Sequence, residues 1–118
     1  MNRVKIKALS VNAAWQGRRF KTDAYKKYER QLMALLPDFD IPDKTPLAIL
    51  VEFGYSNKLS DWDNGLKPFI DVMQKKYGFD DRHIKRATVT VNNNVDKGCD
   101  YIDFKILELK ELCQLVDQ

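Results

Sequence analysis

Cysteine and histidine are scarce in this chain of 118 residues, which has two cysteines and one histidine. Cys99 and Cys113 lack the close spacing of a zinc site, and no ligand histidine lies near either of them. We therefore expect two free thiols and no zinc centre. His83 has no His or Cys partner nearby, so a surface position is favoured over a role as a metal ligand or general base.

Long apolar runs are also missing, since none approaches the roughly 18 residues that a membrane-spanning helix needs. Residues 1–5 alternate charged and apolar side chains and lack the apolar segment of a secretory signal. No internal repeat or low-complexity segment interrupts the 118 residues, of which 44% are hydrophobic. These features predict a single domain over residues 1–118, without a membrane partner and located in the cytoplasm.

The net charge of +3 is unevenly distributed along the chain. Residues 1–36 hold nine Lys or Arg and two acids, a net +7, and residues 37–118 hold eleven and fifteen, a net −4. A basic surface is typical of proteins that bind nucleic acid, and a solvated, lysine-rich helix face is an equally common explanation. That face would carry Lys26, Lys27 and Arg30.

Hydrophobic periodicity predicts the regular elements. Apolar residues alternate over residues 4–8, 47–55, 87–91 and 102–106, which is typical of strands, and they recur at helical spacing over 22–36, 65–77 and 107–116. Pro68 must lie in the first turn of its helix, where its missing N–H costs no hydrogen bond. The order β-α-β-α-β-β-(α) predicts an α+β domain with one small mixed sheet and helices packed against it. We expect residues 10–21 to form a loop and the last two strands to form a hairpin.

Two aspartates between the second strand and the second helix are the strongest functional signal. Asp61 and Asp63 are two residues apart, so in extended backbone their carboxylates point to the same side, with Trp62 facing away into packing contacts. Clustered carboxylates repel one another unless a cation lies among them, and hard oxygen ligands suit Mg²⁺ or Mn²⁺. The alternative is that Asp61, Asp63 and Asn64 cap the helix that follows.

A second acidic pair, Asp80-Asp81, precedes the third strand. If the start of that strand lies beside the end of the second one, carboxylates from two loops converge on one metal. Lys67 follows Asp63 by four residues and could reach a phosphate oxygen or transition-state charge from the same helix face. The alternative for Lys67 is an ion pair with Asp71, which the spacing also permits.

The predicted loop over residues 10–21 mixes aromatic and cationic side chains. Trp15, Arg18 and Arg19 could stack on exposed bases and hold phosphates. A core position explains Trp15 equally well. The candidate DNA-binding residues of this loop are Asn12, Trp15, Arg18, Arg19 and Lys21.

Taken together, these motifs resemble those of the RusA family of Holliday junction resolvases. The similar segments are Asp61-x-Asp63-Asn64-x-x-Lys67 with Asp71, then Gly78-Phe79-Asp80-Asp81-x-x-Ile84, and Ser10-x-Asn12 in the N-terminal loop. The resemblance extends from about residue 3 to residue 108 and is more specific than an isolated Asp-x-Asp pair.

The resemblance implies a small, homodimeric α+β endonuclease that depends on Mg²⁺, with Mn²⁺ as a substitute, and resolves four-way DNA junctions by paired nicks. By position, Asp61, Asp63 and Asp81 would be the catalytic, metal-binding carboxylates, and Lys67 the catalytic lysine. Asn64, Asp71 and Asp80 would lie beside the site.

Two other functions fit the same sequence. One is a structure-specific DNA-binding protein without cleavage activity, and the other is an α+β interaction domain whose aspartates are helix caps. A dimer interface could use the apolar side chains of the last segment, although packing onto the protein's own sheet would also explain them. Those side chains are Leu109, Leu112, Cys113, Leu115 and Val116.

Overall fold

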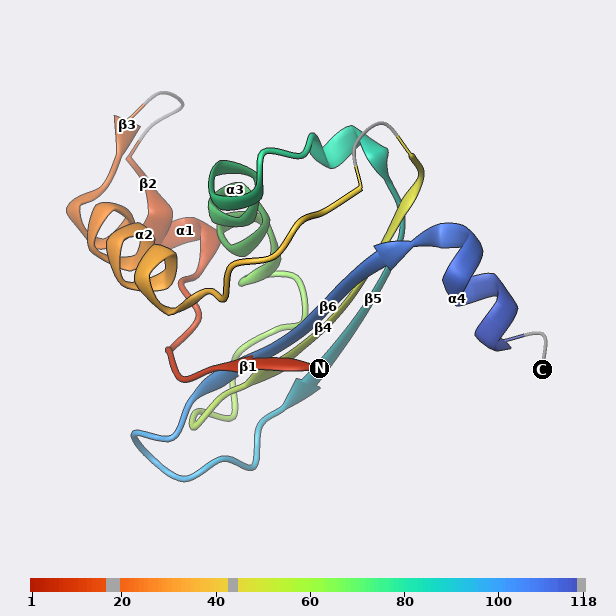
Figure 1. Ribbon diagram of the computed structural model, residues 1–118. Helices are drawn as coiled ribbons and strands as arrows, with labels where there is room; N and C mark the ends of the chain where they lie inside the picture. Colours follow the sequence, from red (N-terminus) through yellow and green to blue (C-terminus); the bar gives the residue numbers. More distant parts are fainter. Residues whose placement is uncertain (17–19, 43–44, 117–118) are drawn as a thin grey trace.

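The protein is described by a computed structural model that covers residues 1–16, 20–42 and 45–116 (Figure 1). A mixed sheet of four strands has the order β1-β6-β4-β5, formed by β1 (Asn2–Val4), β4 (Leu47–Gly54), β5 (Ile84–Asn92) and β6 (Tyr101–Glu108). Helices α2 (Asp23–Leu35) and α3 (Leu66–Tyr77) pack on one side, and α4 (Leu109–Val116) follows β6 at one end. The predicted α+β class is confirmed, and the longer elements follow the predicted order, although the first strand covers Asn2–Val4 and not residues 4–8.

The segment predicted as a loop over residues 10–21 contains short regular elements. Helix α1 (Val11–Ala14) comes first, and β2 (Trp15–Gln16) then pairs antiparallel with β3 (Phe20–Lys21). Ser10 caps α1 by accepting a hydrogen bond from the Asn12 N–H at 3.1 Å. These elements are too short to show a period in the sequence, which is why the pattern did not predict them.

The predicted hairpin between the last two strands is wrong. β5 runs parallel to β4 at the edge of the sheet, and β6 lies between β1 and β4, antiparallel to both. Burial explains the order: Tyr101, Ile102, Phe104 and Leu107 of β6 are buried, whereas Lys85 to Thr88 of β5 are exposed. The apolar strand takes the centre and the polar strand the edge.

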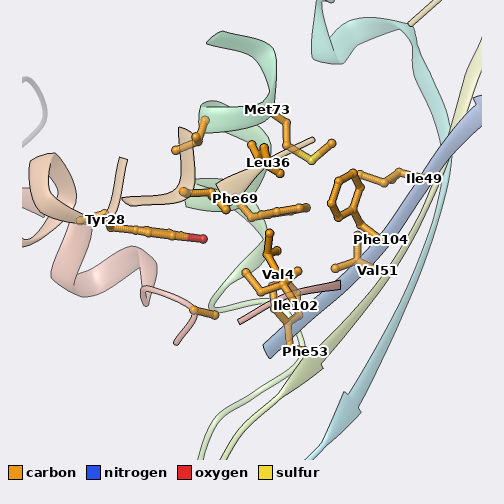
Figure 2. Close-up of a cluster of buried hydrophobic side chains, with 14 of the residues drawn as sticks. Val4, Tyr28, Leu36, Ile49, Val51, Phe53, Phe69, Met73, Ile102 and Phe104 are labelled. Atoms are coloured by element: carbon orange, nitrogen blue, oxygen red, sulfur yellow. The ribbon is translucent and has the colours of Figure 1, made fainter. Parts of the chain in front are cut away.

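Three phenylalanines fix α3 across the sheet (Figure 2). Phe69 of α3 lies edge-on to Phe53 of β4, with ring centroids 6.2 Å apart, and to Phe104 of β6, with centroids 5.6 Å apart. All three side chains are fully buried. Edge-to-face pairs add to the free energy of burial, so this contact holds the helix in a defined position over the strands.

Helix α2 begins where the sequence predicts. The Thr22 hydroxyl accepts a hydrogen bond from the Tyr25 N–H at 3.1 Å, which caps the helix. Tyr25, Tyr28 and Leu32 are buried, but Leu35, which the helical spacing placed in the same stripe, is 47% exposed.

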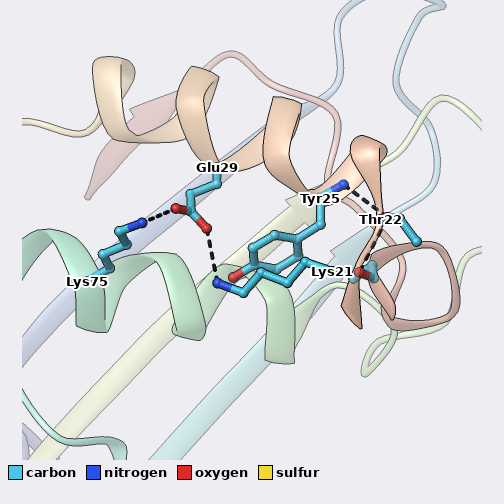
Figure 3. A network of polar contacts seen from close by, with 6 residues as sticks. Lys21, Thr22, Tyr25, Glu29 and Lys75 are labelled. Atoms are coloured by element: carbon cyan, nitrogen blue, oxygen red, sulfur yellow. Dashed lines mark hydrogen bonds and ion pairs between the residues drawn. The ribbon is translucent and has the colours of Figure 1, made fainter. Parts of the chain in front are cut away.

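A polar contact joins α2 to α3 (Figure 3). The Glu29 carboxylate lies between Lys75 of α3 and Lys21, and it forms ion pairs with both ammonium groups. Partial burial works against the charged form of Glu29, but the hydrogen bond from Lys75 and the charge of Lys21 lower the pKa of the carboxyl group from its usual 4.5. The contact fixes the base of the N-terminal segment against α3.

The other face of the sheet is covered in part by α4. Leu112 is buried with Ala48 and Leu107, and Leu109 packs against this cluster. Ala48, on the opposite face of β4 from Leu47 and Ile49, is therefore buried as well. The apolar residues Leu109 and Leu112 thus pack onto the protein's own sheet.

The rest of the apolar terminal segment is described by its backbone alone. The side chains of Cys113, Leu115 and Val116 lie outside the described part of the structure. Among the described residues, no helix is long and apolar enough to cross a membrane.

Candidate functional site

The Asp61-x-Asp63-Asn64 motif forms an exposed turn that leads into α3. The side chains of Asp61 and Asp63 are exposed, and Asn64 is half-buried. The Leu66 N–H donates to the Asp63 carbonyl at 3.2 Å, and α3 begins at Leu66. Pro68 is therefore in the first turn, as predicted.

Residues 62–65 are a turn and not extended backbone, so the strand alternation that placed the Asp61 and Asp63 carboxylates on the same side does not apply. The expectation that Trp62 packs inward, which assumed strand geometry, is wrong, because its side chain is 60% exposed. The capping alternative also lacks support in the described residues, since no side chain forms a cap at Gly65, the residue before α3. Asp61 and Asp63 are left available to a ligand.

Gly65 fixes the position of this turn. A Cβ at this residue would lie 2.7 Å from the Tyr55 hydroxyl oxygen, too close unless an atom shifts, and 3.2 Å from the Ala8 Cβ, a tight contact. The backbone is packed directly against buried Tyr55, whose pKa is raised to about 12 by burial and by the charge of Asp100. Sequence reasoning missed this role, because a single glycine carries no signal of close packing.

The loop before Asp61 is held by one side chain. The Asn57 carbonyl oxygen Oδ1 accepts hydrogen bonds from the N–H groups of Leu59 and Ser60, each at 2.9 Å, and from the Ser60 hydroxyl at 3.0 Å. The Asn93 amide donates to the Asn57 main-chain carbonyl at 3.1 Å. Asp61 therefore follows a loop whose shape is set by local hydrogen bonds.

The N-terminal motif lies directly on this turn. The Val11 N–H donates to the Asn64 carbonyl at 2.8 Å, so Ser10-x-Asn12 and Asp61-x-Asp63-Asn64 are in backbone contact. Between them is a pocket of about 420 Å³, whose lining includes Lys7, Ser10, Asn57, Ser60 and Asn64. The structure thus brings together two of the three motifs that carry the resemblance.

Lys67 makes the ion pair that its spacing permits. Its Nζ lies 2.9 Å from Asp71 Oδ1, and the side chains are 61% and 19% exposed, respectively. An i,i+4 surface pair of this kind contributes only about 0.2–0.5 kcal/mol. Lys67 can therefore exchange Asp71 for a phosphate at little energetic cost.

Asp80 and Asp81 lie at the other end of α3. Parallel pairing places Gly54, at the end of β4, beside Asn92, at the end of β5, so the expected contact between the end of β4 and the start of β5 is wrong. A helix of 12 residues separates the two acidic pairs, a length of about 18 Å. Within the described ranges, no group of three His, Cys, Asp or Glu residues is arranged to hold a metal ion.

The second acidic pair has local partners of its own. The Asp80 carboxylate accepts a hydrogen bond from the Arg82 N–H at 3.0 Å and pairs with its guanidinium, also at 3.0 Å. The Asp81 N–H donates to the Gln74 side-chain oxygen at 3.0 Å, while its own carboxylate is exposed. Half-buried His83 closes this short 3₁₀ turn.

The proposed DNA-binding residues of the N-terminal segment differ in their surroundings. Trp15 is half-buried with its ring centroid 5.9 Å from that of Tyr25, so it packs on the core, and Asn12 is exposed. The Lys21 Nζ lies 3.4 Å from Glu29 and 4.7 Å from the Tyr25 ring centroid. Arg18 and Arg19 lie outside the described residues.

Two comparisons with known proteins find no match to this chain. No protein-family model matches the chain, and no curated protein matches it either. The resemblance to the RusA family therefore depends on its motif residues alone.

Proposed function

We propose that this protein is a cytoplasmic, magnesium-dependent endonuclease that resolves four-way DNA junctions by paired, symmetric nicks. The observation that supports this function best is the backbone contact between Val11 and Asn64, which joins the N-terminal motif to the exposed Asp61-Asp63 turn. Two sequence motifs that resemble one nuclease family thereby form one surface.

The donor set of this turn fits Mg²⁺. Proteins bind Mg²⁺ through one or two carboxylates together with water and substrate phosphates, and Mn²⁺ accepts the same oxygen ligands. Asp61 and Asp63 provide two exposed carboxylates on one turn. The ion would polarise the scissile phosphate and lower the pKa of an attacking water.

Lys67 lies four residues after Asp63, on the helix into which this turn leads. In the first turn of α3 it can leave Asp71 and approach the phosphate, where its charge would offset the negative charge that develops in the transition state. Asp71 then serves to hold the lysine beside the site before DNA binds.

Asp81 belongs to this proposal only as part of a dimer. Because α3 separates it from Asp63 within one protomer, the third carboxylate would come from a second copy of the chain. An isologous two-fold places the same two surfaces against each other in both directions, so two identical sites would form. Two sites related by a two-fold also match the two nicks that a four-way junction requires.

A DNA-binding protein without cleavage activity is the second candidate. The separation of Asp63 from Asp81 and the engagement of Lys67 by Asp71 favour it, and the basic N-terminal third would suffice for binding. A synthetic four-way junction distinguishes the two candidates. The endonuclease binds it and nicks it when Mg²⁺ is added, whereas the binding protein leaves it intact.

Metal affinity tests the third alternative, an interaction domain without a site. A ligand that binds only the folded state raises its free energy of unfolding, by about 2.7 kcal/mol at 100 times the dissociation constant. We expect Mn²⁺ to raise the thermal unfolding midpoint of the wild-type protein. An unchanged midpoint at millimolar Mn²⁺ would contradict the metal site.

A further inference from the structure

A second pocket, of about 730 Å³, lies beside the N-terminal segment, and its lining includes four cationic residues. Its charged residues are Arg3, Lys5, Lys7, Lys97 and Asp100. Four positive charges and one negative charge leave a formal +3. Arg3 is already neutralised by Asp103, to which it donates hydrogen bonds of 2.7 and 2.9 Å. The three lysines and Asp100 then leave a formal +2.

Lys5 and Lys7 both line this basic pocket. Burial alternates along this segment: Lys5 and Lys7 are exposed, Ile6 is half-buried, and Ala8 is buried. Within the described ranges, neither lysine forms an ion pair, so both charges are available to an external anion.

Lys97 reaches the same pocket from the loop between β5 and β6. Gly98 has a positive φ of 83°, and the Cys99 N–H donates to the Asp96 carbonyl at 2.9 Å. The next residue, Asp100, is 8% exposed and accepts a hydrogen bond from the Ser56 N–H at 3.2 Å. This contact anchors the loop that carries Lys97 to the segment that leads to Asp61.

The basic pocket adjoins the smaller pocket beside the candidate site. Lys7 lines both this pocket and the smaller one that reaches Ser60 and Asn64. A chain of negative charges that lies across Lys97, Lys5 and Lys7 would therefore continue toward the Asp61-Asp63 turn. Three cations spread along such a path suit an extended polyanion better than a single small anion.

We propose that Lys5, Lys7 and Lys97 bind successive phosphates of the DNA strand that passes the Asp61-Asp63 turn. This inference rests on the proposed function, because it takes DNA as the substrate, and it specifies the path of the strand. The lysines hold the backbone without reading its sequence, since ammonium groups on phosphates carry no base information. The occupant is a deoxyribose-phosphate backbone.

Salt-dependent binding of a synthetic four-way junction, measured in Ca²⁺ to keep the DNA intact, tests this path. Each lysine–phosphate contact releases about one counterion, so Lys5→Gln with Lys7→Gln should flatten the plot of log affinity against log salt by about 2. The matched control is Lys85→Gln with Lys105→Gln, which removes two exposed charges from β5 and β6. We expect the control to keep the wild-type slope.

Each outcome has a distinct meaning. If the wild-type protein binds with a steep slope and both double variants keep it, or both lose it equally, the proposed path is wrong and the endonuclease proposal stands. If the wild-type protein does not bind the junction at all, the proposed function fails and takes this inference with it.

Alkylation of Cys99 provides a second readout that needs no variant. Its thiol is exposed and lines the basic pocket. A DNA strand across the pocket should slow its reaction with iodoacetamide at least several-fold, as measured by mass spectrometry of the peptide that contains it. Junction DNA that binds and leaves the alkylation rate unchanged would place the strand elsewhere.

Discussion

The Val11 N–H donates to the Asn64 carbonyl oxygen at 2.8 Å, and this hydrogen bond joins two motifs that are far apart in the sequence. Val11 opens α1, and Asn64 lies in the turn before α3. The contact places the exposed Asp61 and Asp63 carboxylates where the basic residues 1–36 meet the acidic part of the chain, residues 37–118. Substitutions around this surface should therefore affect cleavage, DNA binding and stability in separable ways.

Lys67→Ala should reduce junction cleavage by about 10² to 10³-fold, because it removes a cation from the developing charge. The lost ion pair with Asp71 should cost only a few tenths of a kcal/mol in the free energy of unfolding. Single-turnover cleavage and thermal unfolding measure the two effects separately. A variant that loses junction affinity but retains the cleavage rate would make Lys67 a binding residue only.

Gly65→Ala should destabilise the protein by about 1–3 kcal/mol and impair cleavage, since its Cβ would collide with the Tyr55 hydroxyl. The control is Gly78→Ala. Gly78 has a positive φ of 76°, and a Cβ added there would meet no atom within 4 Å, so this change should cost about 1–2 kcal/mol through backbone strain alone. We expect Gly78→Ala to cleave normally once folded. Equal loss of cleavage in both variants would contradict a specific role for Gly65.

Glu29 should make stability depend on pH in the acid range. Its pKa is lower in the folded protein than its usual 4.5, so its contribution is present above that value and is lost as the pH falls through the folded-state pKa. Glu29→Gln should lower the free energy of unfolding at neutral pH by no more than about 1 kcal/mol, because the lysine partners are exposed. The difference from the wild-type protein should vanish at low pH. A difference that is constant from pH 7 to pH 2 would contradict the role of these ion pairs.

A mixing experiment tests the origin of Asp81. If each metal site takes Asp61 and Asp63 from one protomer and Asp81 from the other, Asp63→Asn and Asp81→Asn are each inactive alone. A heterodimer of the two variants contains one intact site, so co-refolding should restore nicking of one strand. No recovery in verified heterodimers would remove Asp81 from a shared site.

The sequence predicted those parts of the fold that have a strong local period or cap. Leu47 to Gly54 alternates clearly, and Thr22 and Pro68 mark the starts of α2 and α3, so these elements were found. The position of β6 at the sheet centre was not, because a strand's local pattern does not identify its neighbours. The edge position of β5 agrees with the polar composition of Lys85 to Thr88, which are exposed in the structure. The sequence therefore contained a signal for this position.

The candidate site was predicted in part. The Lys67-Asp71 contact depends on short-range spacing, which the sequence contains directly, whereas the same-side placement of Asp61 and Asp63 assumed extended backbone where the structure has a turn. The distance between Asp63 and Asp81 depends instead on whether β4 and β5 are parallel, which is a property of the whole sheet. The role of Gly65 depends on Tyr55 and Ala8, whose proximity only the folded chain reveals.

The most direct test of the proposed resolvase activity is cleavage of a synthetic four-way junction, with and without Mg²⁺. The wild-type protein and Asp63→Asn are compared. Asparagine keeps the shape of the side chain and removes one anionic ligand. We expect paired symmetric nicks by the wild-type protein only with Mg²⁺, and loss of cleavage with retained junction binding in the variant. Near-normal cleavage by Asp63→Asn, or wild-type nicking of linear duplex as readily as of junctions, would contradict the proposed resolvase.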